Sequence, residues 1–321
     1  MRLSRLLLGR LAAFVVSLLV ASLAVFLLLN LLPGDVTAVI LGNNATPAAV
    51  AHLRSAMGLD DPVLLRYVHW LAGVAHGNLG ASAFTGEPVA GLIVPKLAVT
   101  ISLVGGGMVL AMVLALPAGL FAALHRRQAS GQMVLATSQL GMAVPAFLAG
   151  IVLVVVFAAR LRWLPAGNYV PLTSDPLDWF RHLILPWVSL ALVQGAVLVR
   201  YVRGAFLDVM DQDYMRTARS IGWRRRRAVW RHGLRNAALQ IVTVLGLQLA
   251  TLFVGAVVIE NVFVLPGLGS LLLRSVNGRD LPLVQAIVLV LVALILMINL
   301  LVDVAYLVID PRLRTGRAVV E

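Results

Sequence analysis

The 321-residue sequence contains no cysteine and few charged residues. Without thiols the chain can form no disulfide, no thiolate metal site and no cysteine nucleophile. Charged residues make up 12% of the sequence, about half the fraction usual in soluble domains, whereas 60% of the residues are hydrophobic. One soluble core cannot hide this much apolar surface. The composition therefore argues against a cytosolic enzyme, a secreted disulfide scaffold or a disordered regulator, and predicts an integral membrane protein.

Sequence motifs of common enzymes are also missing. The chain has no G-x-x-x-x-G-K-S/T phosphate loop and no G-x-S-x-G nucleophile motif. Its histidines lack metalloprotease spacing; they are His52, His69, His76, His125, His182 and His232. We therefore expect no catalytic, cofactor or metal site in this chain, and any ATP with its Mg²⁺ must be bound by a separate subunit.

Six long runs without charge follow one another along the chain. A membrane span needs about 20 apolar residues. Five of the runs meet that length, and the fourth, between His182 and Arg200, is shorter but can be extended by snorkelling of the flanking arginines. The first run leads into Leu32-Pro33-Gly34-Asp35 rather than into a signal-peptide cleavage site. The predicted spans lie within 1–32 and at about 97–124, 133–159, 183–199, 237–259 and 283–305.

Arginine placement predicts the topology. With six spans both termini lie on one side, and 18 of the 26 basic residues fall on that side: three before the first span, two at 124–132, ten at 200–238 and three in the tail. The positive-inside rule then places both termini in the cytoplasm. We expect four parts: 1–32 as cytoplasmic N-terminus and first span, 33–95 as an extracytoplasmic segment, 96–306 as a transmembrane domain, and 307–321 as a cytoplasmic tail.

Local patterns add detail to this plan. Two helical patterns are expected in the external segment, one from Thr46-Pro47 to Met57 and one from Pro62 to Val74. Prolines inside spans are expected to kink or open their helices; they are Pro117, Pro145 and Pro186. The run Gly105-Gly106-Gly107 would allow two helices to cross closely.

The loop at 200–236 is the most informative segment. We expect two short helices that meet at Gly222, because glycine ends a helix readily in the left-handed conformation. In the second helix an apolar stripe is surrounded by arginines; the stripe comprises Trp223, Val229, Trp230 and Leu234. This loop has three possible interpretations. It could be a basic amphipathic helix lying on anionic lipid, a nucleic-acid site, or a docking site for a cytoplasmic partner.

The order of residues favours docking. The pattern Thr217-Ala218-x-x-x-Gly222 resembles the coupling motif of binding-protein-dependent ABC importer permeases. The residues on either side of it are similar to those of the dipeptide/oligopeptide permease family, and within that family the chain resembles the B-type permease subunit. Further matching motifs run through the chain: Leu32-Pro33-Gly34-Asp35, Gly77-Asn78-Leu79-Gly80, Trp163-Leu164-Pro165, Pro266-Gly267-Leu268-Gly269, Arg279-Asp280 and Asp310-Pro311-Arg312.

The resemblance implies an all-α integral membrane protein of six spans with the type I ABC importer transmembrane fold. It implies a permease subunit that forms half of a pathway for di- or oligopeptides in a prokaryotic plasma membrane. The implied partners are a second homologous permease, two ATP-binding subunits or a fused pair, an extracytoplasmic peptide-binding protein and membrane lipid, without nucleic acid. The implied ATPase-coupling residues are Tyr214, Arg216, Thr217, Ala218, Arg219, Gly222, Trp223, Arg231, His232, Arg235 and Asn236.

Two alternatives to the peptide importer remain open. Permeases for nickel or glutathione share the same motifs, and a stand-alone membrane enzyme or channel would belong to another class. Acidic residues in spans are candidates for a pathway or gate, namely Glu260 and Asp303. For Asp303 we favour a structural role beside an arginine or a helix end, because a single acid without a partner forms no catalytic dyad.

Overall fold

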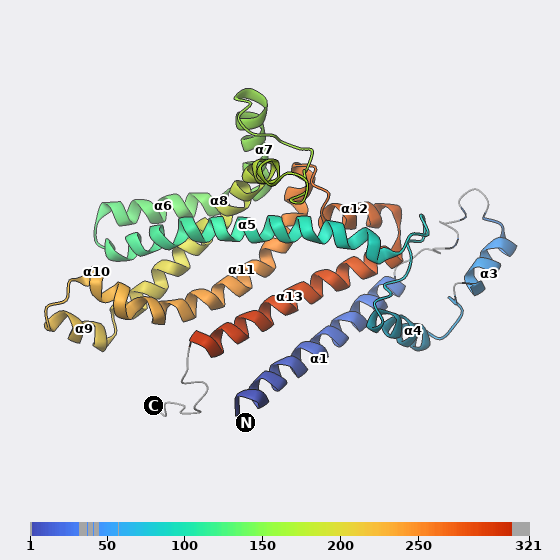
Figure 1. Cartoon of the computed structure of the whole chain (residues 1–321), viewed down its shortest axis with the longest axis horizontal. Coiled ribbons are helices and arrows are strands. Elements are labelled where there is room, and N and C mark those ends of the chain that lie inside the picture. Colours follow the sequence, from blue (N-terminus) through green and yellow to red (C-terminus); the bar gives the residue numbers. More distant parts are fainter. Residues whose placement is uncertain (1, 32–36, 38–40, 42–44, 57, 310–321) are drawn as a thin grey trace. The chain divides into compact units, whose positions relative to one another are not determined.

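A computed structural model of the chain describes residues 2–31, 37, 41, 45–56 and 58–309 (Figure 1). The predicted turn at 32–35 and the tail from 310 onward lie outside these residues. The described part consists of helices and their connections, with one isolated bridge between Ala81 and Pro88 and no strand. The predicted all-α architecture is therefore confirmed.

Five helices in the described residues contain a stretch long and apolar enough to cross a membrane. They are α1 (Arg2–Leu31), α5 (Val89–Leu124), α8 (Pro176–Met210), α11 (Leu234–Val262) and α13 (Leu281–Ile309). The two helical patterns expected outside the spans are also present, as α3 (Pro47–Ala56) and α4 (Val63–Ala75).

The sequence run predicted as one span at 133–159 is broken. It comprises α6 (Ala129–Ala143), α7 (Ala146–Leu153) and the π-helix η2 (Val154–Arg160), and the two halves are bent by 93°. Pro145 has no N–H for the helix ladder and pushes Val144 into the extended region, with ψ at 120°. The kink expected at Pro145 is confirmed, whereas Pro117 and Pro186 lie within unbroken helices.

Helix α8 is much longer than the span predicted at 183–199. It begins at Pro176, where the Asp175 side chain accepts hydrogen bonds from the N–H groups of Leu177 (2.9 Å) and Asp178 (3.1 Å). It continues to Met210 because buried apolar residues carry the helical pattern past the charges that bounded the uncharged run. The loop predicted to begin at residue 200 therefore leaves the helix only at Asp211.

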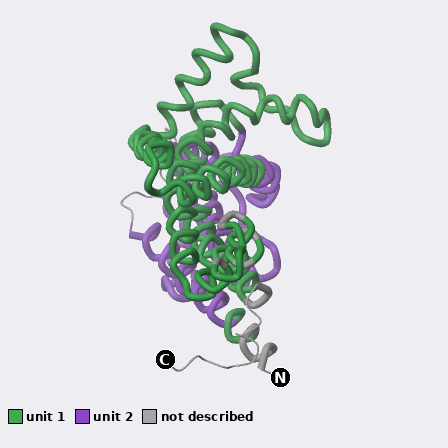
Figure 2. Tube along the Cα trace, turned by 90° about the vertical axis from the view of Figure 1, so that its left-hand side faces the viewer, with its two compact units in different colours: residues 1–11, 101–265, 297–321 green, residues 12–100, 266–296 purple. Residues whose placement is uncertain are grey.

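The chain divides into two compact units, which we describe separately (Figure 2). Unit 1 comprises residues 1–11, 101–265 and 297–321, and unit 2 comprises residues 12–100 and 266–296. In unit 1, α8 packs against α6, α7 and α11. A β-carbon at Gly106 would lie 2.1 Å from the Trp187 ring, so the predicted close crossing at the glycine run is confirmed between α5 and α8.

Unit 2 has its own apolar core. It joins Val89 and Ile93 of α5, Leu268 of α12 (Leu268–Gly278), and Leu283 and Ile287 of α13. On α4, the Tyr67 ring packs edge-on against Phe26 of α1, and the Tyr67 hydroxyl lies 2.8 Å from the Ser22 hydroxyl.

Asp280 ties the loop before α5 to the start of α13 within unit 2. Its carboxylate is buried and accepts hydrogen bonds from the Ser82 hydroxyl (2.5 Å), the Ala83 N–H (3.1 Å) and the Leu283 N–H (3.3 Å). One side chain thus caps a spanning helix and fixes a loop almost 200 residues away in sequence.

Replacing Asp280 by alanine should destabilise the protein by about 2–4 kcal/mol, because it leaves buried donors without their charged acceptor. We expect a lower apparent Tm in detergent and faster proteolysis at residues 81–88. Asp60→Ala is the matched control, because Asp60 forms an exposed ion pair with Arg54 that contributes at most about 1 kcal/mol. Equal Tm values for the two variants would contradict the anchoring role of Asp280.

Candidate functional site

The segment between α8 and α11 folds as an elbow, which we define as residues 213–233. It comprises α9 (Asp213–Ser220), α10 (Arg225–Ala228) and the π-helix η3 (Val229–Gly233), which runs directly into α11. The prediction of two short helices on either side of Gly222 is confirmed.

Gly222 supplies the bend of the elbow. Its φ is +91°, in the left-handed region that favours glycine. The Trp223 N–H donates a hydrogen bond to the Ala218 carbonyl at 3.1 Å, which is the 6→1 hydrogen bond of a Schellman motif at the end of α9. A β-carbon at position 222 would meet no atom within 4 Å. The requirement for glycine is therefore one of backbone conformation and not of space.

Apolar side chains anchor both halves of the elbow in the core of unit 1. Met215 and Ala218 of α9 and Ala228 and Val229 of the second half are buried at 7% exposure or less. They pack in one cluster with residues of three long helices: Leu120 and Ala123 of α5, Val202, Ala205, Phe206 and Val209 of α8, and Ala237 and Ile241 of α11. Each large side chain buried in this way contributes about 1.5–3 kcal/mol, so the elbow is fixed to the ends of α5, α8 and α11.

Aromatic and polar contacts reinforce this anchoring. The Trp223 ring forms cation–π contacts with two guanidinium groups, with the Cζ atoms of Arg227 and Arg231 at 5.2 Å and 5.7 Å from the ring centroid. The Asn236 amide, at the start of α11, donates to the Tyr214 hydroxyl on α9 at 2.8 Å. The two halves of the elbow therefore hold a defined angle with respect to α11.

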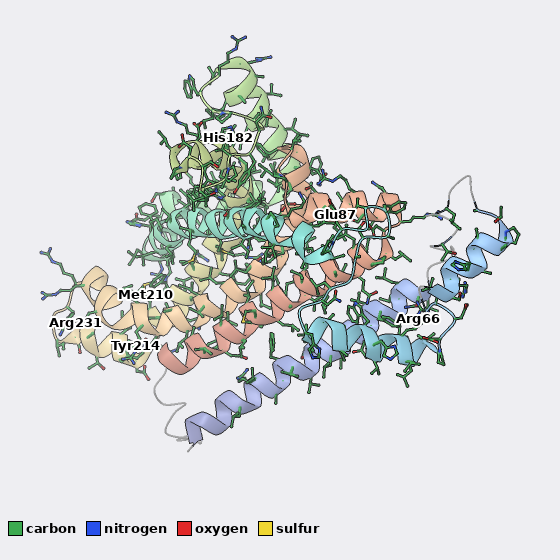
Figure 3. All side chains as sticks on the ribbon, turned by 45° about the vertical axis from the view of Figure 1, so that its right-hand side comes forward. Arg66, Glu87, His182, Met210, Tyr214 and Arg231 are labelled. Atoms are coloured by element: carbon green, nitrogen blue, oxygen red, sulfur yellow. The ribbon has the colours of Figure 1, made fainter. Side chains whose placement is uncertain are left out.

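The outward side of the elbow is exposed and basic. Ile221, next to the bend, is 71% exposed, and Tyr214 is 39% exposed. The Arg216 side chain is 74% exposed and forms an ion pair with Asp213 at 3.3 Å. Figure 3 shows Met210, Tyr214 and Arg231 at the same end of unit 1. Ile221 thus places one apolar side chain at the bend of an otherwise basic surface.

The predicted coupling residues divide into two groups. Ala218 has its side chain in the core, where it anchors α9, and its part in coupling to an ATPase stays a prediction. Trp223 is half-buried, and the side chains of Arg219 and His232 lie outside the described residues. The exposed members are Tyr214, Arg216, Thr217, Gly222, Arg231, Arg235 and Asn236.

Sequence reasoning missed several contributors to the elbow. Met215 is buried to 1% and lies three residues before Ala218, so helical spacing from Ala218 could have identified it. Ile221 was missed because a single apolar residue beside a glycine gives no periodic signal. A polar contact between spanning helices was missed as well: the Gln194 amide of α8 donates to Gln248 of α11 at 2.7 Å, and the Thr251 hydroxyl donates to the same oxygen at 3.0 Å.

The two acidic candidates have different surroundings. Asp303 of α13 forms an ion pair with Arg10 of α1 at 2.5 Å, which is the arginine contact that the structural interpretation requires. The Glu260 side chain is completely buried in α11, so it offers no surface to an external protein. In the described part of the chain, no group of three or more histidine and acidic side chains could hold a metal ion.

The fold is that of a multi-helix protein with several helices long and apolar enough to cross a membrane. Residues 115–315 match the family described as binding-protein-dependent transport system inner membrane component, and residues 3–104 match the N-terminal family of such components. The chain belongs to this family and is an inner-membrane permease component of the ABC importer type.

Relatives share almost the full length of the chain. A probable peptide ABC transporter permease protein of Sinorhizobium fredii is 39% identical over 307 residues, which cover 96% of this chain and 98% of the relative. A glutathione transport system permease protein of Escherichia coli is 37% identical over 305 residues, which cover 95% and 97%. The family resemblance expected from the motifs is confirmed.

A solved structure shows the same fold. The methionine ABC transporter MetNI, in an inward-facing conformation, aligns with a TM-score of 0.58 at 16% identity, over 70% of this chain and 99% of the MetNI chain. The expected ABC importer transmembrane fold is therefore confirmed.

Gly222→Ala should loosen the elbow locally, because an alanine at this φ costs roughly 1–2 kcal/mol without any steric clash. Faster hydrogen–deuterium exchange at 213–233, with unchanged exchange in the long helices, is the expected result. The matched control is Gly204→Ala in α8, where a β-carbon also meets nothing within 4 Å but φ is not positive. Identical exchange in both variants would show that the bend does not depend on the conformation of Gly222.

Asp303→Arg should reduce membrane assembly, because it places two arginines in contact, and Arg10→Asp in the same chain should restore it by reversing the ion pair. The yield of monodisperse protein from membranes measures both effects. Normal assembly of Asp303→Asn together with lost uptake would instead assign Asp303 to the pathway.

Proposed function

We propose that this chain is one of two membrane subunits of an ATP-driven importer for di- and oligopeptides. The named peptide permease among the relatives supports the substrate class. The family assignment supports the importer class.

The structural observation that carries the proposal is the anchored elbow with its exposed bend. A coupling element must dock to a moving partner and transmit that movement to the spans. The buried half of the elbow is packed against α5, α8 and α11, while Ile221 projects into solvent at 71% exposure. A displacement of the bend is therefore transmitted to three long helices as a rigid-body movement.

We propose that the other components of the importer are separate subunits. ATP and Mg²⁺ would be bound by two ATPase subunits or a fused pair, because this sequence has no phosphate loop. A second homologous permease would complete the pathway as a heterodimer, and an extracytoplasmic binding protein would deliver the peptide. With the elbow and both termini in the cytoplasm, as the distribution of arginines favours, the ATPases would meet the elbow.

A glutathione-type importer is the second candidate, favoured by the 37% identity to the Escherichia coli glutathione permease. Uptake of labelled dipeptide, tripeptide, glutathione and Ni²⁺ by cells that contain this permease and its partners distinguishes the candidates. Peptide-dependent uptake supports the proposal, and uptake of glutathione or Ni²⁺ alone overturns it.

Ile221→Asp should weaken co-purification of the ATPase subunits at least about tenfold, because it places a charge at the centre of an apolar contact. The variant should keep its thermal stability, since the Ile221 side chain is 71% exposed and therefore buries little apolar surface. Tagged chain from native membranes, analysed by mass spectrometry, measures the association.

Ala218→Asp is the comparison variant. It buries a charge in the core and should lower thermal stability as well as ATPase recovery. Full ATPase recovery with Ile221→Asp would contradict docking at the bend, and recovery of the wild-type chain without any ATPase would contradict the importer itself.

A further inference from the structure

A basic cavity lies beside the elbow, entirely within unit 1. It has a volume of about 410 Å³ and is formed between the turn that follows α5 and the start of α9. Arg126, Arg127 and Arg216 line it together with one acidic residue, Asp211. Two of the three guanidinium groups have a carboxylate partner, Asp211 for Arg126 and Asp213 for Arg216. One positive charge remains in excess around a space large enough for a phosphate group.

The arginines can be recruited by an anion at small cost. Arg126 donates to both Asp211 oxygens at 3.2 Å and 3.3 Å, and Arg216 pairs with Asp213 at 3.3 Å. Both carboxylates are well exposed, and exposed pairs of this kind contribute at most about 1 kcal/mol. Arg127 has no acidic partner among the residues that the structure describes. A phosphate would gain bidentate contacts that these weak pairs do not supply.

The turn that carries two of these arginines is held in place by its own hydrogen bonds. The Gln128 N–H donates to the His125 carbonyl at 2.9 Å, and the Gln132 amide donates to the Arg126 carbonyl at 3.0 Å. The cavity is therefore bounded by a defined turn on one side and by anchored α9 on the other.

The position of the cavity favours a lipid over a soluble anion. Two spanning helices, α5 and α8, end at its edge, with Leu124 and Met210 among the lining residues, and buried Met215 lines it as well. The rest of the lining is polar, and we expect a mostly polar cavity at the ends of two spanning helices to lie level with the lipid headgroups. The positive-inside rule puts that end at the cytoplasmic leaflet.

We propose that this cavity binds the phosphate of an anionic phospholipid from the cytoplasmic leaflet. The headgroup contacts Arg126 and Arg127 from the turn and Arg216 from α9, so one lipid links the end of α5 to the first half of the elbow. Bound anionic lipid thereby stabilises the packing of α9 against the end of α5. The lipid site itself does not depend on the proposed transport function, and it differs from general attraction of the arginine-rich loop to the membrane because it requires particular arginines.

Native mass spectrometry tests the proposal on the tagged full chain with its co-purifying subunits, after delipidation in detergent. The complex is titrated with phosphatidylglycerol, with phosphatidylcholine and, separately, with inorganic phosphate. We expect retention of phosphatidylglycerol but not of phosphatidylcholine. Arg127→Gln and Arg216→Gln should each weaken retention about fivefold, as expected for one arginine near a charged headgroup.

Arg224→Gln is the matched control, because Arg224 is an exposed arginine of the same elbow that does not line the cavity. Unchanged retention in this variant supports a defined site, whereas an equal loss shows diffuse attraction and overturns it. Inorganic phosphate that binds with the same arginine dependence and displaces the lipid reassigns the cavity to a soluble anion. Retention by the isolated chain but not by the complex shows that a protein subunit fills the cavity, which also overturns the proposal.

Discussion

The functional account depends on one packing interaction, in which four small and medium apolar side chains of the elbow are buried against the long helices of unit 1. Met215, Ala218, Ala228 and Val229 share one cluster with the ends of α5, α8 and α11. Without this cluster, the arginine-rich segment would be a solvated loop between two spans. With it, a bend at Gly222 is held in a fixed position, and any force applied there acts on the long helices.

Charged residues and apolar packing determine different properties of this chain, namely its orientation in the membrane and its fold. The arginines gather at one end of the spans, where they favour a cytoplasmic orientation and an anionic surface. The exposed ion pairs Arg126–Asp211 and Arg216–Asp213 contribute little to the stability of the fold. The fold depends on apolar clusters and on a few buried polar anchors such as Asp280, which joins a loop to the start of α13.

The sequence predicts the membrane architecture well, because long uncharged runs have few alternative structures. It also predicts the bend at Pro145 and the break at Gly222, since both follow from backbone chemistry. It fails where tertiary contacts decide. Charges at Arg200 and Arg203 did not end α8, because buried neighbours continue it to Met210. The inward face of Ala218 depends on distant helices. The sequence favours an arginine beside Asp303 but does not identify that arginine as Arg10 of α1.

Site-specific cross-linking in native membranes tests the central claim most directly, namely that the elbow presents its bend to an ATP-hydrolysing subunit while its inner face stays in the core. The chain has no cysteine, so Ile221→Cys and Ala218→Cys each introduce a single thiol for a short bifunctional reagent. The account predicts a cross-link from position 221 to a phosphate-loop ATPase and none from position 218. A cross-link from 218 but not from 221, or no ATPase adduct from either position, would contradict it.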